Sequence, residues 1–124
     1  MFDPDFSSDV VDALVRNRFI DYASNVGVYT DGLDTEALSF TVLREVAEEA
    51  MDPQDREHVT RFIRMRPLRF RMMDVYPDDW WPGPKLSVDT QEDLDRVRAI
   101  YVHLEPGKFS MRDTLDAWEK AGRP

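Results

Sequence analysis

The chain has 124 residues, of which 25 are acidic and 16 are Lys or Arg, so its formal net charge at pH 7 is -9. This length fits one domain or a piece of one, and a hydrophobic share of 42% is typical of a globular protein. The excess of acidic residues argues against nucleic-acid binding, which depends on Lys and Arg that neutralise phosphates.

Composition also indicates the compartment. The sequence contains no cysteine, which excludes disulfides and cysteine metal sites and favours a reducing cytoplasm. No apolar run reaches 18 residues, and the opening residues M-F-D-P-D-F lack the basic region of a secretory signal. We therefore expect a soluble, cytoplasmic protein with neither a nucleic-acid nor a membrane partner.

The first part of the chain predicts a helix followed by two strands. Apolar residues recur at helical spacing over 7–19. The face expected to be buried consists of Val10, Val11, Leu14, Val15 and Phe19. Residues 21–28 indicate a short strand, and Asp31-Gly32 indicates a turn. Residues 33–40 then alternate apolar and polar side chains, as a half-buried strand does.

The middle of the chain predicts two helices and a further strand. The spacing of apolar residues predicts a helix over 42–50. Asp52 followed by Pro53 predicts the start of the next helix, because these residue types are favoured at the N-cap and the first helical position. That helix must end near Pro67, and residues 69–76 indicate a strand.

The last part predicts a loop, a strand and two helices. Residues 78–84 contain two prolines and a glycine and are expected to form a loop. Residues 86–88 are expected to end a buried strand. Thr90, three residues before Asp93, then has the spacing of a capping box at the start of a helix. The same pattern at 110–113 starts the last helix.

The fold class is α/β, because predicted helices and strands alternate along the chain. Only about four strands are expected, and the first element is a helix. A doubly wound sheet normally begins with a strand and a phosphate-binding turn. No G-x-G-x-x-G or G-K-S/T motif is present. We therefore expect the back half of a Rossmann-like sheet with flanking helices, without an N-terminal nucleotide-binding half.

Asp89 is the first candidate for a functional role. It is expected at the carboxyl end of a strand and beside a helix N-terminus, which is where ligands bind in open α/β sheets. A carboxylate at that point can bind Mg²⁺ where a nucleotide supplies the other oxygens. The alternative is a structural acid held by backbone amides and the helix dipole, and spacing alone favours this alternative.

Three other features carry weaker signals. Asp34 and Glu36 share one face of an extended segment and could accept hydrogen bonds from sugar hydroxyls, or be the solvated face of an edge strand. His58 could be a general acid or base, or a donor to an anionic substrate, but a histidine satisfied by its helix neighbours is favoured. The six arginines in 56–71 could meet an anionic sugar or a partner, although most are expected on a solvated helix face.

Three segments together carry a family resemblance: D-G-L-D-T-E-A-L-S-F (31–40), D-R-E-H-V-T (55–60) and S-V-D-T-Q-E-D-L-D-R-V-R-A-I-Y (87–101). They resemble the C-terminal half of the cytidylyltransferases that make CMP-sugars, especially the spore coat polysaccharide biosynthesis branch. Residues 9–25, ending in D-Y-A-S-N, fit the same branch. The resemblance keeps the order and spacing of these motifs over nearly the whole chain.

The resemblance implies a nucleotide-sugar transferase fold and a Mg²⁺-dependent transfer of CMP from CTP to a sugar, with release of pyrophosphate. It implies that Asp89, which matches the acid of the family's V-D-T-x-E-D motif, is a metal ligand. Asp34, Glu36, Glu57 and His58 match motif positions that we place around the sugar. Such a reaction is chiefly positioning and neutralisation of phosphate charge.

The sequence departs from the family pattern in one major respect. The family's front half, with its CTP-phosphate loop and second metal-binding acid, has no counterpart in residues 1–124. Minor departures are Gln91 and Thr30 in place of usual prolines. We therefore expect a single partial domain over 1–124 that is inactive alone and acts on CTP and a sugar when a nucleotide-binding half complements it.

Other functions remain open from the motifs. As a homo- or hetero-oligomer, the chain could instead be a non-catalytic sugar-nucleotide binding module. It could also be an interaction subunit that docks on a full-length relative, in which case an exposed apolar face is expected. No residue is assigned to catalysis, and the motifs do not name the sugar.

Overall fold

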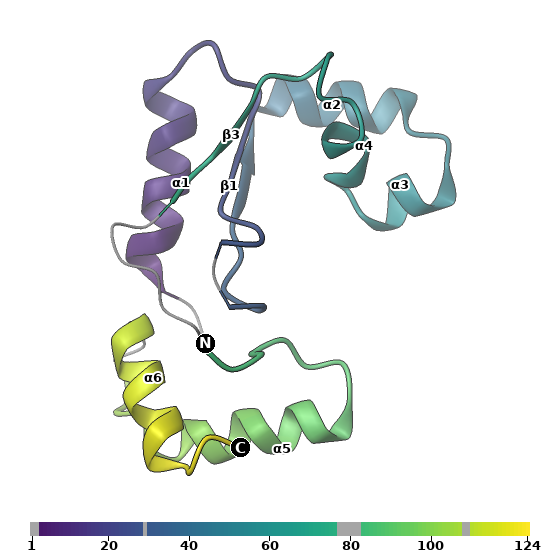
Figure 1. The fold of residues 1–124 in the computed structure, drawn as a ribbon. Helices are drawn as coiled ribbons and strands as arrows, with labels where there is room; N and C mark the ends of the chain where they lie inside the picture. The colour runs from purple at the N-terminus through teal and green to yellow at the C-terminus, as the bar shows by residue number, and fades with distance from the viewer. Residues whose placement is uncertain (1–2, 29, 77–82, 108–109) are drawn as a thin grey trace. The chain divides into compact units, whose positions relative to one another are not determined.

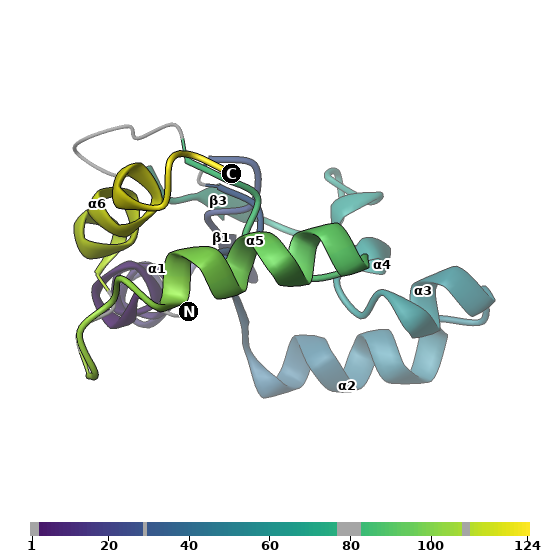
Figure 2. The ribbon, with the colours of Figure 1, turned by 90° about the horizontal axis from the view of Figure 1, so that it is seen from below.

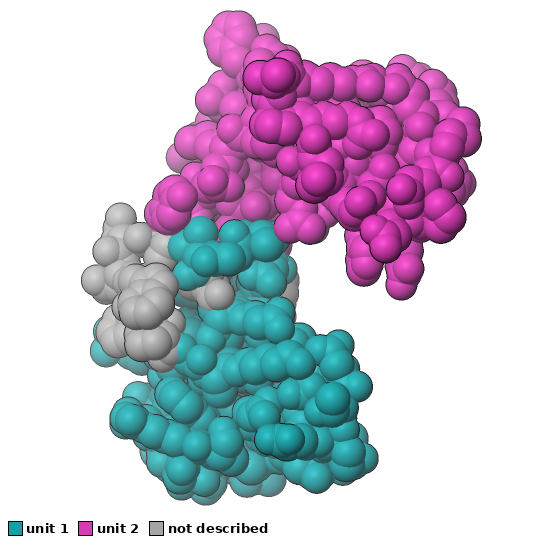
Figure 3. Space-filling view, turned by 45° about the vertical axis from the view of Figure 1, so that its right-hand side comes forward, with its two compact units in different colours: residues 1–7, 26–34, 77–124 teal, residues 8–25, 35–76 magenta. Residues whose placement is uncertain are grey.

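The computed structural model describes residues 3–28, 30–76, 83–107 and 110–124, and it shows a mixed α/β fold (Figure 1). The chain forms two compact units, which are coloured separately in Figure 3. Unit 1 consists of residues 1–7, 26–34 and 77–124, and unit 2 consists of residues 8–25 and 35–76. Each unit therefore combines segments that are distant in sequence.

The sheet lies in unit 2. It contains β1 (Tyr22–Ser24), β2 (Glu36–Leu38) and β3 (Met72–Asp74), in the order β2-β1-β3. The central strand β1 pairs antiparallel with β2 and parallel with β3, and all three of its residues are buried. The strands predicted within 21–28, 33–40 and 69–76 are confirmed with shorter bounds.

Helices lie on both sides of this sheet (Figures 1 and 2). On one side is α1 (Pro4–Arg16), and on the other are α2 (Phe40–Glu49), α3 (Pro53–Glu57) and α4 (Arg61–Arg64). The buried core of unit 2 joins β1 to the second group: Tyr22, Val42, Val46, Ala50, Phe62, Ile63 and Phe70. No helix in the described parts of the chain is long and apolar enough to span a membrane.

Helix α1 begins earlier and buries less than the sequence predicts. Pro4 occupies its first turn, and the Asp3 carboxylate accepts a hydrogen bond from the backbone N–H of Asp5 at 3.0 Å. Proline suits this position because its missing N–H would have no helical partner. The predicted inward face is wrong in part: Val10 is buried, but Val11, Val15 and Phe19 are 46%, 70% and 75% exposed.

The predicted third helix is two short helices. Asp52 caps α3 as expected, its carboxylate accepting from the Gln54 N–H at 2.8 Å. The backbone leaves the helical region at His58 and is helical again at Thr60, the residue before α4. The β-branched pair that follows, Val59 and Thr60, has low helix propensity. The break matters because it turns the Thr60 side chain toward the sheet.

Unit 1 contains α5 (Gln91–Tyr101) and α6 (Met111–Lys120), which pack against each other (Figure 2). Both predicted capping boxes are present, at Thr90 with Asp93 and at Ser110 with Asp113. The core of this unit consists of Leu33, Leu86, Ile100, Met111 and Ala117. The interior of unit 1 is thus formed by residues of the two capped helices together with Leu33 and Leu86.

The strand predicted at 86–88 does not form. The backbone N–H groups of Leu86 and Ser87 both donate to the Asp31 carbonyl, at 2.7 and 3.2 Å. This segment therefore packs onto the 31–32 turn instead of joining a sheet. Gly32 permits the approach, since its φ is 102° and a Cβ there would lie 2.4 Å from the Ser87 nitrogen. Residues 78–82 of the predicted loop 78–84 lie outside the described residues.

Candidate functional site

Glu36 is the first residue of β2 in unit 2, and its carboxylate contacts one residue of β1 and one residue just before α4. In the β1–β2 register Glu36 is opposite Ser24, so their side chains share one face of the sheet with Tyr22. The Tyr22 hydroxyl donates to Glu36 Oε1. The Thr60 hydroxyl, just before α4, donates to Glu36 Oε2 at 3.0 Å. Glu36 itself is exposed, whereas Tyr22 and Thr60 are buried.

The environment of Tyr22 keeps this residue a hydrogen-bond donor. Burial raises the pKa of the Tyr22 hydroxyl well above its usual value, and the hydrogen bond to the Glu36 carboxylate raises it further. The hydrogen bond with Ser24 and the charge of Arg64 oppose the shift and are smaller effects. Tyr22 is therefore protonated throughout the physiological range and can only present its O–H to Glu36.

Glu57 and His58 lie next to this cluster in sequence but not in its hydrogen-bond network. Glu57 ends α3 and His58 follows it, and both are exposed. Both backbone polar groups of His58 are hydrogen-bonded. Its N–H donates to the Gln54 carbonyl at 2.9 Å, and its carbonyl accepts from the Arg61 N–H at 2.8 Å. Its imidazole remains accessible to solvent, which a role in binding requires.

Asp34 and Asp89 belong to unit 1, so the predicted sugar-binding and metal-binding residues are divided between the two units. Asp34 is exposed and ends the segment 26–34. Its predicted neighbour Glu36 starts β2 of unit 2.

Asp89 precedes the N-cap of α5, as predicted, although no strand leads into it. Its carboxylate accepts from Lys85 Nζ at 2.7 Å and its side chain is 70% exposed. The same ammonium donates to Asp93 at 3.0 Å. Lys85 therefore joins an exposed carboxylate to a buried one, and its own pKa is raised by both, with Asp89 the larger cause.

Asp93 is the structural centre of this helix start. Its Oδ2 accepts from the backbone N–H groups of Asp89 and Thr90, at 3.1 and 3.0 Å. Its Oδ1 accepts from Arg96 at 2.8 Å. Arg96 lowers the Asp93 pKa most, followed by Lys85, so this carboxylate stays ionised far into the acid range.

The described residues supply little of a Mg²⁺ site by themselves. No three His, Asp or Glu side chains among them gather at one point as a protein-held metal requires. Asp93 is occupied by its capping and ion-pair contacts. Asp89 and Glu92 are the exposed carboxylates at this helix start, and of the two Asp89 is the one that matches the family motif. One carboxylate is compatible with a Mg²⁺ held mainly by substrate phosphates, so the metal role of Asp89 stays a prediction.

Most arginines of the basic stretch 56–71 form ion pairs or hydrogen bonds with other residues of this chain. Arg61 and Arg66 pair with the buried Asp55, Arg69 pairs with Glu45 and Glu49, and Arg71 pairs with Asp21. These ion pairs tie the α3–α4 region and the start of β3 to their neighbours. The Arg64 side chain is exposed and makes no hydrogen bond or ion pair among the described residues, although its charge acts on Tyr22.

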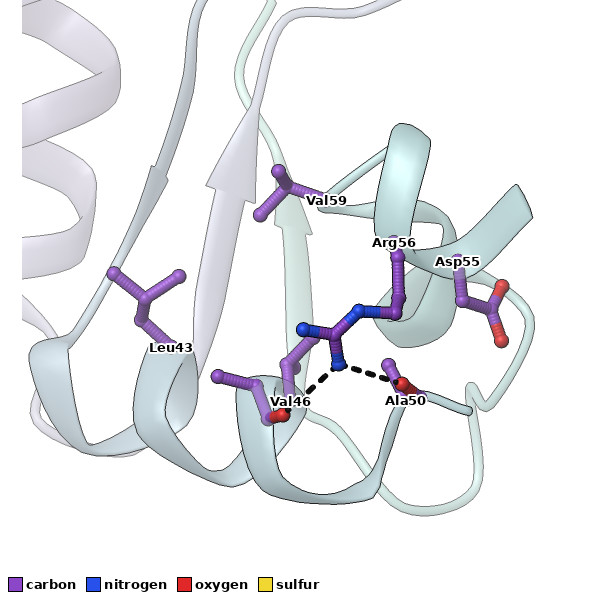
Figure 4. A pocket seen from close by; sticks show the side chains of 7 residues that line it. Leu43, Val46, Ala50, Asp55, Arg56 and Val59 are labelled. Atoms are coloured by element: carbon purple, nitrogen blue, oxygen red, sulfur yellow. Dashed lines mark hydrogen bonds between the residues drawn. The ribbon is translucent and has the colours of Figure 1, made fainter. Parts of the chain in front are cut away.

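Arg56 and the start of the 55–60 motif have a structural role (Figure 4). The Arg56 guanidinium reaches from α3 to the end of α2 and donates to the Ala50 carbonyl at 3.2 Å. A cation at this position compensates the unpaired carbonyls and the dipole of α2. The Asp55 carboxylate points away from Arg56, toward Arg61.

A mainly apolar pocket of about 170 Å³ opens beside Arg56 (Figure 4). It is lined by Leu43, Val46, Ala47, Ala50, Asp55, Arg56 and Val59. This volume is below the roughly 300–1,000 Å³ of typical small-molecule sites. None of the predicted site residues is in that lining, so the pocket does not identify a nucleotide or sugar site.

Sequence reasoning missed Tyr22, Thr60 and Lys85. The contact between Thr60 and Glu36 spans 24 residues and depends on the break between α3 and α4. Tyr22 lies in the D-Y-A-S-N segment, and its two-residue spacing from Ser24 is the signal that places both on one strand face. Lys85 lies four residues before Asp89, and this spacing of opposite charges is the signal that could have indicated their ion pair.

Comparison with known proteins supports the resemblance at the level of fold. A solved cytidylyltransferase from Leptospira borgpetersenii superposes on 91% of this chain and 49% of its own chain, with a TM-score of 0.81 and 20% sequence identity. The chain has the fold of part of a cytidylyltransferase. The expected likeness in fold is thereby confirmed, since the small mixed sheet and its helices match this structure.

Two curated proteins are similar in sequence. The uncharacterized protein MJ1063 of Methanocaldococcus jannaschii is 28% identical over 112 residues, which cover 89% of this chain and 45% of that protein. The spore coat polysaccharide biosynthesis protein SpsF of Bacillus subtilis is 29% identical over 73 residues, covering 56% of this chain and 30% of SpsF. No protein-family model matches. The chain thus spans less than half the length of these relatives.

Proposed function

We propose that this chain is the sugar-side and metal-side half of a cytidylyltransferase that transfers CMP from CTP to a sugar for surface polysaccharide biosynthesis. The observation that carries the proposal is the fold match: 91% of the chain superposes on about half of a cytidylyltransferase. The similarity to SpsF, a spore coat polysaccharide biosynthesis protein, supports the polysaccharide context.

The accessible polar residues support the sugar side of this proposal. Glu36, Glu57 and His58 are all exposed within unit 2, and Asp34 is exposed within unit 1. Carboxylates accept hydrogen bonds from sugar hydroxyls, and a neutral imidazole can donate or accept. We assign these four residues to sugar binding.

On the metal side we assign Asp89 as the carboxylate contact of Mg²⁺. Its exposure and its position before α5 leave it accessible to a phosphate-bound cation. Lys85, which pairs with it, would exchange this contact for a phosphate oxygen. Mg²⁺ neutralises phosphate charge and orients the transferring group when bound. We place binding of the CTP phosphates in the part of the longer relatives that this chain does not match.

The test combines sugar binding with turnover. The folded chain is examined by saturation-transfer NMR with glucose, galactose, mannose, N-acetylglucosamine and N-acetylneuraminate, and by pyrophosphate release from CTP with MgCl₂. We expect binding of at least one sugar without turnover. Adding the uncovered part of the Leptospira protein should give Mg²⁺-dependent release, which Asp89→Asn abolishes. A folded chain that binds none of these sugars overturns the proposal.

A second function is favoured by one specific observation on α1. Val11 and Val15 are exposed apolar side chains one turn apart on α1, and Phe19 is exposed in the turn after the helix. Exposed apolar side chains that are grouped in this way are typical of an interaction surface. The chain would then be a subunit that docks on a longer cytidylyltransferase. Light scattering of the chain mixed with its full-length relative distinguishes this function, because Val15→Glu should abolish the complex and leave sugar binding unchanged.

A further inference from the structure

Glu36 differs in its surroundings from Asp55, a buried carboxylate of the same unit. Asp55 is 5% exposed and is paired with the guanidinium groups of Arg61 and Arg66, which is how a structural acid is neutralised. Glu36 is exposed, and both of its oxygens accept from neutral hydroxyls, those of Tyr22 and Thr60. No cation pairs with Glu36 among the residues that the structure describes.

The two donors are themselves fixed. Tyr22 lies in the central strand β1 and is 2% exposed, with its ring in the core of unit 2. Thr60 is buried directly before α4. The backbone of β2 is also fixed, because Asn25 Oδ1 accepts from the Thr35 N–H at 2.6 Å, one residue before Glu36. The Glu36 carboxylate is thus held from the protein side by groups with little freedom to move.

Two of the acceptor positions of this carboxylate remain for a ligand. An ionised carboxylate has about four lone-pair sites, and the two hydroxyls use one on each oxygen. Because Glu36 is exposed, the free sites face solvent. Adjacent hydroxyls of a sugar ring are donors of the required kind and can engage both oxygens at once.

Resting on the proposed function, we propose that Tyr22 and Thr60 are positioning residues that orient the Glu36 carboxylate to accept hydrogen bonds from two neighbouring hydroxyls of the sugar. Preorganisation of this kind raises affinity because the side chain loses less freedom when the sugar binds. The ligand class is a polyol with vicinal hydroxyls, and a deoxygenated analogue should bind more weakly.

The test uses the same five monosaccharides and the full chain. Tyr22→Phe and Thr60→Val each remove one hydroxyl and nearly preserve shape, whereas Thr60→Ser keeps the hydroxyl as a rescue. The exposed Tyr76 gives the matched control Tyr76→Phe. Circular dichroism and thermal unfolding are measured on every variant, so that lost stability is separated from lost binding.

We expect Tyr22→Phe and Thr60→Val to weaken sugar binding about fivefold each, the effect of one hydrogen bond. Thr60→Ser and Tyr76→Phe should bind as the unmodified chain does. If Glu36→Gln loses binding while Tyr22→Phe and Thr60→Val retain it, the positioning role is overturned and the proposed function stands. If the unmodified chain binds no sugar, the proposed function itself fails.

Discussion

The Asp3 carboxylate accepts a hydrogen bond from the backbone N–H of Met111 at 2.7 Å, across a sequence separation of 108 residues. Its other oxygen accepts from the N–H of Asp5 at the start of α1. Met111 is the first residue of α6, so one buried carboxylate satisfies unpaired donors at the starts of two helices. Unit 1 is therefore tied together by a carboxylate whose second partner lies too far along the chain for a sequence pattern to indicate it.

We predict that Asp3→Ala destabilises the chain by about 2 kcal/mol, because it removes a helix cap and leaves a buried N–H without its partner. Urea unfolding followed by tryptophan fluorescence measures the change. The control is Asp5→Ala, which removes an exposed acid from the first turn of α1 and should cost only about 0.3–1 kcal/mol. Equal effects of the two substitutions would contradict the role of Asp3.

Asp93 should make stability depend on pH in the acid range. Arg96 and then Lys85 lower its folded pKa, whereas an unfolded Asp titrates near about 3.9. The contribution of Asp93 to folding stability is therefore fully present above that pH and is lost as the pH falls toward the folded pKa. Thermal unfolding between pH 6 and pH 2 measures this.

The Asp93→Asn variant should have a lower midpoint at pH 6 and a shallower decline toward pH 2. Asp95→Asn is the matched control, because Asp95 is an exposed acid of the same helix. It should follow the slope of the unmodified chain. A parallel decline for Asp93→Asn would show that other carboxylates determine acid unfolding.

Tyr22 should make folding stability depend on pH in the opposite sense, with a loss as the pH rises in the alkaline range. Its folded pKa is raised, by burial first and by Glu36 second, above the value near about 10 of an unfolded tyrosine. Its contribution to stability is therefore fully present below about pH 10 and is lost as the pH rises toward the folded pKa. Tyrosinate absorbance near 295 nm should show a component that ionises only above pH 10. Tyr22→Phe should remove this component, and Tyr76→Phe should leave it in place.

The local signals in the sequence were reliable where one short segment determines the structure. The capping boxes at Thr90 and Ser110 and the N-cap at Asp52 form as predicted, because each depends on residues within four positions. The prediction of a strand at 86–88 was wrong because the hydrogen-bond partner of this segment lies far away in the sequence. A short apolar stretch does not reveal whether its backbone donors meet another strand or, as here, the Asp31 carbonyl.

The candidate site could be predicted only as a set of residue types. Motif positions identified Glu36 as polar and accessible, but its contacts to Tyr22 and Thr60 depend on strand register and on a helix break. The arginines of 56–71 show the same limit. Their partners include Asp21, Glu45 and Glu49, which lie 20 to 50 residues away and follow no sequence period.

Within the D-R-E-H-V-T segment (55–60), Asp55 and Glu57 should have separable roles, one in stability and the other in sugar binding. Asp55 is buried against Arg61 and Arg66, which are themselves partly exposed. Asp55→Ala should therefore destabilise the chain by about 2 kcal/mol, because Arg61 loses its carboxylate partner and Arg66 keeps only its hydrogen bond to the Phe62 carbonyl. Glu57→Gln, two residues later on the exposed face, should change stability by less than about 0.5 kcal/mol yet weaken sugar binding. Urea unfolding and saturation-transfer NMR on both variants provide the comparison, and a stable Asp55→Ala variant with lost sugar binding would reverse the assignment.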